Sequence, residues 1–167
     1  MKALVLALLP ALAAVPAVAD VAAVAAPVAQ AALDPRVEAA LNADALAYAD
    51  DEGDFRLVYR LGDDRTQVVW VASSTAKITR LELRDVWSLA YRGAGQVTPE
   101  LAKRLLIENA RMVLGAWQVN QAPDKFLVVY LAQIPADADA ASLQEVIEAV
   151  AVSADRIEKE LTGADEF

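Results

Sequence analysis

The stretch from residue 54 to residue 73 constrains the fold more than any other part of the chain. In residues 54–61 apolar and polar side chains alternate, which is typical of a β-strand with one buried face. Residues 66–73 are apolar at both parities, which favours a strand covered on both faces. A short polar turn containing Gly62 joins the two segments. We therefore predict a β-hairpin in the middle of a sheet.

The N-terminal residues have the pattern of a targeting segment. Lys2 precedes an apolar run over residues 3–15, and Ala17-Val18-Ala19 offers the small side chains of a cleavage site. We expect residues 1–19 to be a secretory signal peptide that is cleaved near Ala19, and the mature protein to be periplasmic or secreted. An uncleaved membrane anchor is the alternative.

A linker and a single domain are predicted after the signal peptide. Residues 20–32 are nearly all Ala and Val, with Pro27 among them, and have no periodic polar face, so we interpret them as a linker. A buried apolar strand is the alternative, which Ala and Pro disfavour. Residues 33–167 are then long enough for one domain with its own core.

The composition excludes several classes of function. The net charge is −9, or −10 once Lys2 is removed with the signal peptide, and an acidic chain repels phosphate backbones and anionic membranes. We therefore expect no nucleic-acid partner and no stable membrane insertion after cleavage. The chain has no Cys and no His. Ser-His-Asp and Cys-His nucleophiles, imidazole proton transfer and ordinary zinc or haem sites are thereby excluded, and no cofactor is predicted.

Helix starts and further strands surround the hairpin. Asp34-Pro35 and Thr98-Pro99 combine a capping side chain with Pro at the first helical position, and residues 142–145 have capping-box spacing. Periodicity then predicts helices from Pro35 to about Ala49, from Pro99 to Gly115 and from Ser142 to Gly163, a turn at 74–76, and strands over 78–92, 117–119 and 126–134. A bulge is expected near Asp85. The result is an α+β fold with an antiparallel sheet of about five strands and three helices, in the order α-β-β-β-α-β-β-α.

Four arginines form the most informative candidate site. Each lies on the polar parity of its strand, and if the three strands form a meander they share one face of the sheet; they are Arg56, Arg60, Arg80 and Arg84. Guanidinium groups bind carboxylates in a bidentate manner, so this face is a hypothesis for the binding of an acidic partner or anionic ligand. The alternative is ordinary pairing with Glu82 and with helical acids.

The other polar and aromatic candidates receive structural interpretations. Asn109 lies on the apolar stripe of the second helix, so we expect its amide to bond strand backbone and to fix that helix on the sheet. The three tryptophans, Trp70, Trp87 and Trp117, each lie on an apolar strand parity and are expected in the core.

An acidic turn is the one candidate for a metal. Gly53 is surrounded by carboxylates that offer the oxygen ligands of Ca²⁺, namely Asp50, Asp51, Glu52 and Asp54. The turn lacks the spacing of an EF-hand loop, so we interpret it as solvated and predict no metal.

The order of elements resembles the YbjN-domain family, whose members are described as candidate sensory transduction regulators. The resemblance covers roughly residues 33–167. It is carried by Leu105-Leu106 followed by Asn109-Ala110, and by Ala154-Asp155, Glu158, Leu161 and residues 165–167 near the C-terminus. It implies a fold similar to type III secretion chaperones, which bind other proteins and often dimerise. No catalytic residue is established for the family. Secretion chaperones are typically cytoplasmic, and the signal peptide departs from that pattern.

These patterns favour a non-enzymatic, exported interaction or regulatory module, and the resemblance implies a chaperone-like character. Its expected partner is a protein or peptide, with a second copy of the chain as a further candidate. A small carboxylate-dependent hydrolase of cell-wall or sugar substrates is one alternative, and it would require two acids across a cleft. A small-ligand carrier is another, and it would require a cavity inside the fold.

Overall fold

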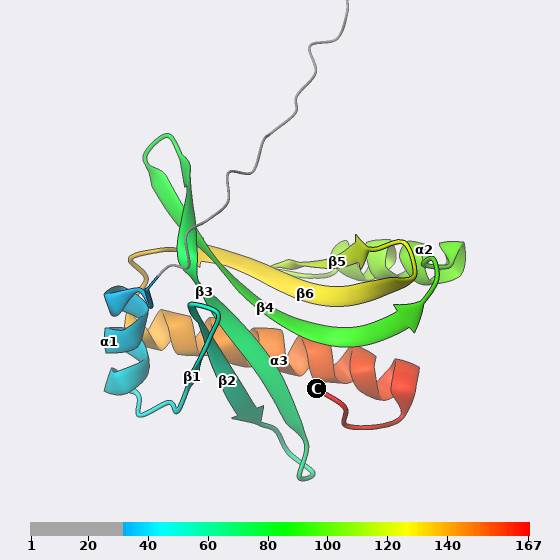
Figure 1. Ribbon diagram of the computed structural model, residues 1–167, viewed down its shortest axis with the longest axis horizontal. Helices are drawn as coiled ribbons and strands as arrows, with labels where there is room; N and C mark the ends of the chain where they lie inside the picture. The colour runs from blue at the N-terminus through cyan, green and yellow to red at the C-terminus, as the bar shows by residue number, and fades with distance from the viewer. Residues whose placement is uncertain (1–31) are drawn as a thin grey trace, which may run out of the picture.

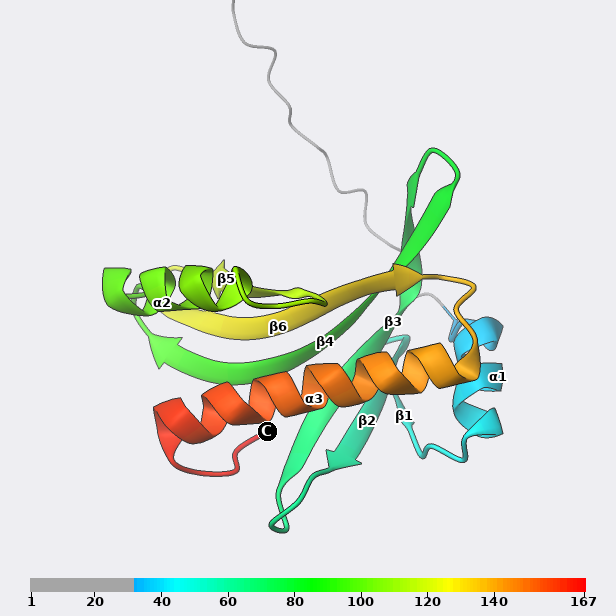
Figure 2. The same ribbon diagram turned by 180° about the vertical axis from the view of Figure 1, so that it is seen from behind.

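The computed structural model describes residues 32–167, which form one antiparallel sheet and three helices (Figures 1 and 2). The predicted α+β class is confirmed, with six strands in place of about five. The helices are α1 (Pro35–Ala43), α2 (Pro99–Asn109) and α3 (Ala140–Thr162), and the strands are β1 (Ala49–Asp51), β2 (Asp54–Arg60), β3 (Thr66–Ile78), β4 (Leu81–Ala94), β5 (Ala116–Gln121) and β6 (Lys125–Pro135). The predicted signal peptide, and the predicted linker apart from Ala32, lie outside the described residues.

The sheet has the strand order β1-β2-β3-β4-β6-β5, and all neighbouring strands are antiparallel. The predicted hairpin is the pair β2–β3, with Arg60 opposite Thr66. Asp63 and Asp64 in its turn both have a φ of 59°, a conformation that Asp tolerates better than most residues. β6 lies between β4 and β5, in agreement with its apolar character at both parities.

Two of the three helices, α2 and α3, lie on one face of the sheet, and α1 packs against α3. α3 runs behind the strands in Figure 1 and in front of them in Figure 2, and α2 lies on the same side. Ile147, Val150 and Ala154 of α3 are fully buried in the core that this layer forms with the sheet. Within residues 32–167 no helix covers the opposite face of β3, β4 and β6, and none is long and apolar enough to cross a membrane.

The helix caps agree with the sequence better than the helix lengths do. Asp34 and Thr98 cap α1 and α2 as expected, and Gly163 ends α3 with a φ of 70°. The start of α3 differs, because Asp139 is its cap and accepts a hydrogen bond from the Ser142 backbone N–H.

Two predicted helices are too long. α1 ends at Ala43 because Ala45 turns to a φ of 53°, and residues near 49 pair with β2 as the unpredicted strand β1. α2 ends at Asn109, and only Leu105 of its predicted stripe is buried. Gly115 lies just before β5 with a φ of 74°, where a Cβ atom would come within 2.6 Å of the Leu131 carbonyl oxygen.

The turn of the β3–β4 hairpin also differs from the prediction. β3 continues through residues 74–76 to Ile78, and the chain turns at Thr79 and Arg80, at the end of a hairpin that projects beyond the other strands (Figure 1). Ser and Thr do not end a strand whose backbone is paired with a neighbouring strand. Here the Thr75 hydroxyl donates to Glu82 Oε1 across the hairpin at 2.9 Å. The expected irregularity near Asp85 is confirmed, because residues 72–74 of β3 face this single β4 residue between the pairs Val71–Val86 and Thr75–Arg84. A second irregularity, in the pairing of β4 with β6, follows Leu89.

The buried parity of β4 is the reverse of the expected one. Its fully buried inward side chains include Ser88 as well as Val86 and Ala90. The Ser88 hydroxyl donates to the Val68 carbonyl at 2.6 Å and accepts from Gln67 Nε2 at 2.9 Å. Polar side chains with such hydrogen-bond partners are stable in a core. A prediction from alternation alone places them in solvent, and this is why the predicted parity was wrong.

Candidate functional site

The predicted arginine face is wrong, first because Arg84 is a core residue. Its side chain is only 2% exposed. Its guanidinium donates to the Asp34 carboxylate at 2.6 Å and to the backbone carbonyls of Ala72 and Ser73. Arg84 therefore holds the start of α1 against the sheet and is not available to a partner.

The remaining arginines are also separated. Arg80 lies in the β3–β4 turn, whereas Arg60 pairs with the first residue of β3. The 13 residues of β3 lie between those positions, roughly 40 Å of extended chain. Only Arg56 and Arg60 share a surface, on the outer face of β2.

Asn109 makes the helix-to-strand contact that its position suggested. Its Oδ1 accepts the Trp117 backbone N–H at 2.6 Å, and its Nδ2 donates to the Trp117 carbonyl at 3.2 Å. The end of α2 is thereby fixed to the start of β5.

Two tryptophans lie on the face of the sheet opposite α2 and α3. Trp117 is in the core as predicted, with 5% of its surface exposed. The prediction is wrong for Trp70 and Trp87, which are only partly buried and stack on each other across β3 and β4, with ring centroids 4.3 Å apart and planes within 7°. Arg56 of β2 lies over the Trp70 ring, 6.0 Å from its centroid.

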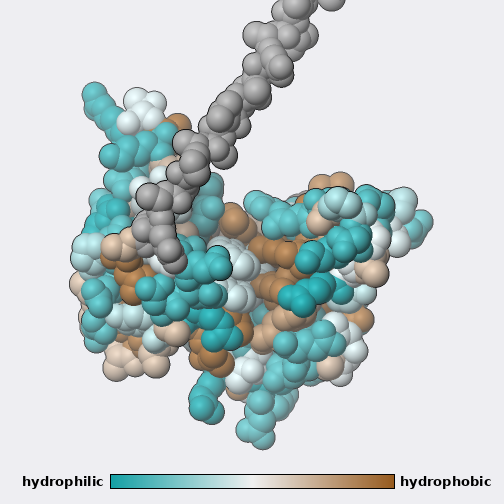
Figure 3. Space-filling view, in the orientation of Figure 1, coloured by the Kyte–Doolittle hydropathy of each residue, from teal (hydrophilic) through white to brown (hydrophobic). Residues whose placement is uncertain are grey.

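A trough extends from the other side of this stack toward β5. Two recesses, of about 280 and 420 Å³, share Asp85, Gln118 and Leu131 as lining residues and together form the trough. Trp87 lines one side and Gln118 the other, above a floor that includes Leu131. In the space-filling view of this face, apolar surface lies near the centre and hydrophilic side chains border it (Figure 3).

The carboxylates around the Trp70–Trp87 stack have neutral partners. Asp51 accepts from Trp70 Nε1, Asp54 from the Ser73 backbone N–H, each at 2.8 Å, and Asp85 from Gln133 Nε2 at 3.0 Å. Asp51, Glu52 and Asp54 line a third recess beside the stack, of about 290 Å³. Across residues 32–167, none of these four acids forms an ion pair, and no Lys or Arg lines the trough or the third recess.

The acidic turn does not form the cation site that was considered for it. Asp50 accepts the Gly53 backbone N–H at 2.8 Å, while Asp51 and Asp54 bond Trp70 and Ser73 as above, so these side chains are engaged separately. In the part of the chain that the structure describes, the group of acids close enough to hold a metal is a different one, Asp155, Glu158 and Asp165.

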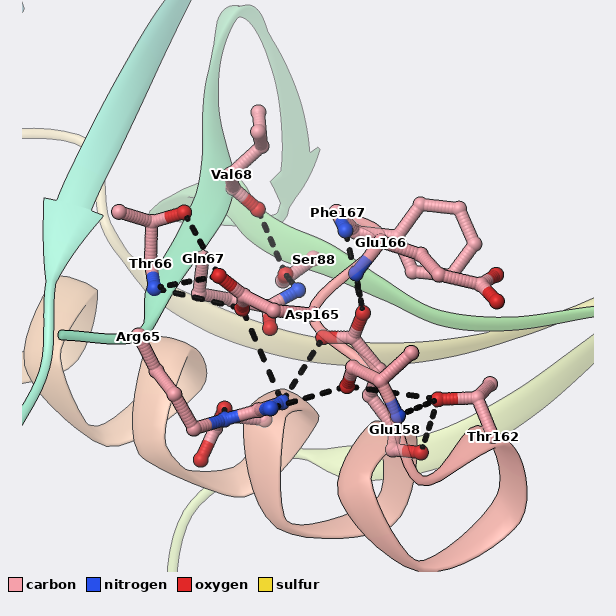
Figure 4. Close-up of polar contacts among 12 residues, drawn as sticks. Arg65, Thr66, Gln67, Val68, Ser88, Glu158, Thr162, Asp165, Glu166 and Phe167 are labelled. Atoms are coloured by element: carbon pink, nitrogen blue, oxygen red, sulfur yellow. Dashed lines mark hydrogen bonds and ion pairs between the residues drawn. The ribbon is translucent and has the colours of Figure 1, made fainter. Parts of the chain in front are cut away.

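That second group is organised by an arginine and by the C-terminal segment (Figure 4). The Arg65 guanidinium, which comes from the β2–β3 turn, pairs with Asp155 and lies 3.7 Å from both Glu158 and Asp165. The buried Glu158 carboxylate accepts the backbone N–H groups of Glu166 and Phe167, the latter at 3.1 Å. Burial raises the pKa of Glu158, against the effect of these hydrogen bonds and of Arg65. We interpret the group as a closure that holds the C-terminus on α3, with Arg65 as its cation.

Sequence reasoning missed both the trough and this closure. The spacing of Asp155 and Glu158, which places both on one helix face, was a signal for the closure. No such spacing indicated Arg65, because it lies 90 residues away from Asp155 in the chain. No protein-family model matches the chain, and no curated protein matches it. The resemblance to the YbjN-domain family stays a prediction.

Proposed function

We propose that the chain is a non-enzymatic, exported interaction or regulatory module that binds a segment of a partner protein in the trough. The observation that carries this proposal is the position of the trough, on a sheet face that no helix of the described residues covers and that presents Trp87 beside polar side chains. Surfaces that combine an exposed aromatic group, an apolar floor and a polar rim are typical of binding sites. A chaperone-like role, as in the family that the sequence resembles, is compatible with this surface.

The shape of the trough favours a chain segment over an enclosed small ligand. It is open along its length, so an extended peptide can lie in it while remaining part of a larger protein. The recess between α1 and the end of β6, in contrast, has a volume of only about 10 Å³, close to that of a single water.

A hydrolase of sugar substrates is the second candidate, because two carboxylates line one recess. Asp54 and Asp85 both border the space beside Trp87, and an aromatic ring can stack on a sugar. Both acids are only half-buried, however, whereas the general acid of a glycosidase typically lies in an apolar pocket. Release of reducing sugar from cell-wall glycan, lost in Asp85→Asn, would favour this candidate.

Site-specific photocrosslinking tests the proposed function. A benzophenone amino acid placed at Gln118, which is exposed in the trough, should give a defined adduct with a partner in cells that express the protein. The same group at Val152, exposed on α3, is the matched control and should give none. An absence of adducts at Gln118, or equal adducts at both positions, would contradict the proposal.

A further inference from the structure

We infer that the trough binds a cationic side chain, Arg or Lys, of the partner segment, placed on the free side of Trp87 between Asp54 and Asp85. This inference rests on the proposed function and adds the chemical class of the partner. It follows from the order of side chains across the sheet and from the charges that line the trough.

The side chains beside the trough lie in a defined order across the sheet. Arg56 pairs with Trp70, Trp70 with Trp87 and Trp87 with Leu131, on the four neighbouring strands β2, β3, β4 and β6. The guanidinium of Arg56 already covers the Trp70 end of the stack. The Trp87 end faces the recess above Leu131, which no Lys or Arg of residues 32–167 lines. A partner's guanidinium or ammonium on that ring would repeat the contact of Arg56, and such cation–π contacts are favourable.

The charges that line the trough complement those of a cationic side chain. Asp54 and Asp85 line the same recess, and each is held by a single hydrogen bond from a neutral donor. With Asp51 and Glu52 beside the stack, four carboxylates surround the two indole rings, and among residues 32–167 none of them has a Lys or Arg partner. An incoming cation supplies the missing charge, and the attraction also orients the encounter.

The floor of the trough suits the aliphatic part of a long cationic side chain. Val129 and Leu131 are apolar and lie beneath the charged rim. The long aliphatic stems of Arg and Lys pack on such a surface while their charged ends stay at the rim. A neutral sugar also stacks on an aromatic ring, but it leaves the carboxylates without counter-charges. The cationic segment therefore fits more of the lining.

Titration with short peptides tests the inference. The purified full chain would be titrated by calorimetry with a ten-residue peptide of alternating Arg and Gly, and with matched Glu-Gly and Gln-Gly peptides. We expect binding of the Arg-Gly peptide only, and at least a tenfold weaker Kd when NaCl rises from 0.05 to 0.5 M, because salt screens exposed charges. We expect at least a tenfold weaker Kd also for the double variant Asp54→Asn with Asp85→Asn.

Matched variants separate a local from a general electrostatic effect. Glu100→Gln with Glu145→Gln removes the same charge from exposed positions on α2 and α3 and should leave the Kd within about twofold. Equal weakening by both pairs, equal binding of the Gln-Gly peptide, or tight binding of a neutral oligosaccharide without binding of the Arg-Gly peptide would overturn the inference. Asparagine keeps the acceptor oxygen used by Ser73 or Gln133, so the fold should persist. If it did not, the comparison of peptides and salts on the unaltered chain would decide.

Crosslinking distinguishes failure of this inference from failure of the proposed function. The Gln118 adduct should disappear in the Asp54→Asn, Asp85→Asn background, as judged by gel and mass spectrometry. An adduct that persists there, or that maps to a partner segment without Arg or Lys, would overturn the cationic assignment and leave the binding function in place.

Discussion

Replacement of Arg84 by Ala should destabilise the fold severely, although the sequence pattern places this residue on the surface. The side chain is 2% exposed and bonds Asp34 and the carbonyls of Ala72 and Ser73. Removing one member of a buried ion pair costs about 3–5 kcal/mol, because its partners stay buried without their bonds. The hydrogen bond from Arg36 is the main reason that the pKa of Asp34 lies well below its usual range. Asp34 therefore keeps one cation in the variant, and we expect a loss near the lower limit, about 3 kcal/mol.

Urea unfolding monitored by tryptophan fluorescence measures this loss. With an m value of about 1.5 kcal/mol per molar urea, a 3 kcal/mol loss lowers the midpoint by about 2 M. Arg84→Met retains most of the buried volume, so a similar loss in that variant would assign the effect to the polar bonds rather than to a cavity. Arg60→Ala is the matched control, because Arg60 is exposed, and it should change stability by less than about 0.5 kcal/mol. If Arg84→Ala behaved like this control, the assignment of Arg84 to the core would be refuted.

Three further predictions concern other parts of the structure. Asn109→Ala should lower thermal stability by about 1–3 kcal/mol, since the Trp117 backbone N–H and carbonyl both lose their side-chain partner. Asn109→Asp keeps only the acceptor, so its stability should lie between that of Asn109→Ala and that of the parent. An unchanged melting curve for Asn109→Ala would contradict the contact. Gly115→Ala should destabilise by more than about 1 kcal/mol because of its positive φ and the close carbonyl, whereas Gly62→Ala, which has open space, should be neutral or slightly stabilising. The raised pKa of Glu158 means that its folded form binds protons more tightly than its unfolded form, so its contribution to stability decreases as the pH rises from 4.5 through the folded pKa. The stability of Glu158→Gln relative to the parent should therefore increase with pH in that range, and a constant difference would refute the role of burial.

The local features of the fold were predictable because neighbouring residues determine them. The hairpin of β2 and β3, two helix caps and the stop at Gly163 follow from short patterns. The buried parity of β4 was not predictable in this way. It depends on partners far away in the chain, such as Asp34 for Arg84, 50 residues apart, and Gln67 for Ser88. β1, with three residues, is too short for periodicity to reveal.

The candidate site illustrates the same limit. The alternation of residues along β3 and β4 indicates that Trp70 and Trp87 contact other side chains. It does not indicate whether a helix or the neighbouring indole ring provides that contact. The arginine face failed because the β3–β4 turn lies at residues 79–80 instead of 74–76. A shift of a few residues in one turn moved Arg80 out of its strand, and the fold placed Arg84 in the core.

The indole N–H signals of the three tryptophans distinguish binding beside Trp87 from binding elsewhere. Trp70 and Trp87 border the carboxylates of the open face, whereas Trp117 is buried beside Tyr130 on the other side of the sheet, with ring centroids 4.9 Å apart. In a ¹H–¹⁵N spectrum of the protein titrated with the Arg-Gly peptide, we expect the largest shift for Trp87, a smaller one for Trp70 and none for Trp117. Unchanged signals at saturating peptide, or a shift of Trp117 equal to that of Trp87, would refute the binding of a cationic segment beside Trp87.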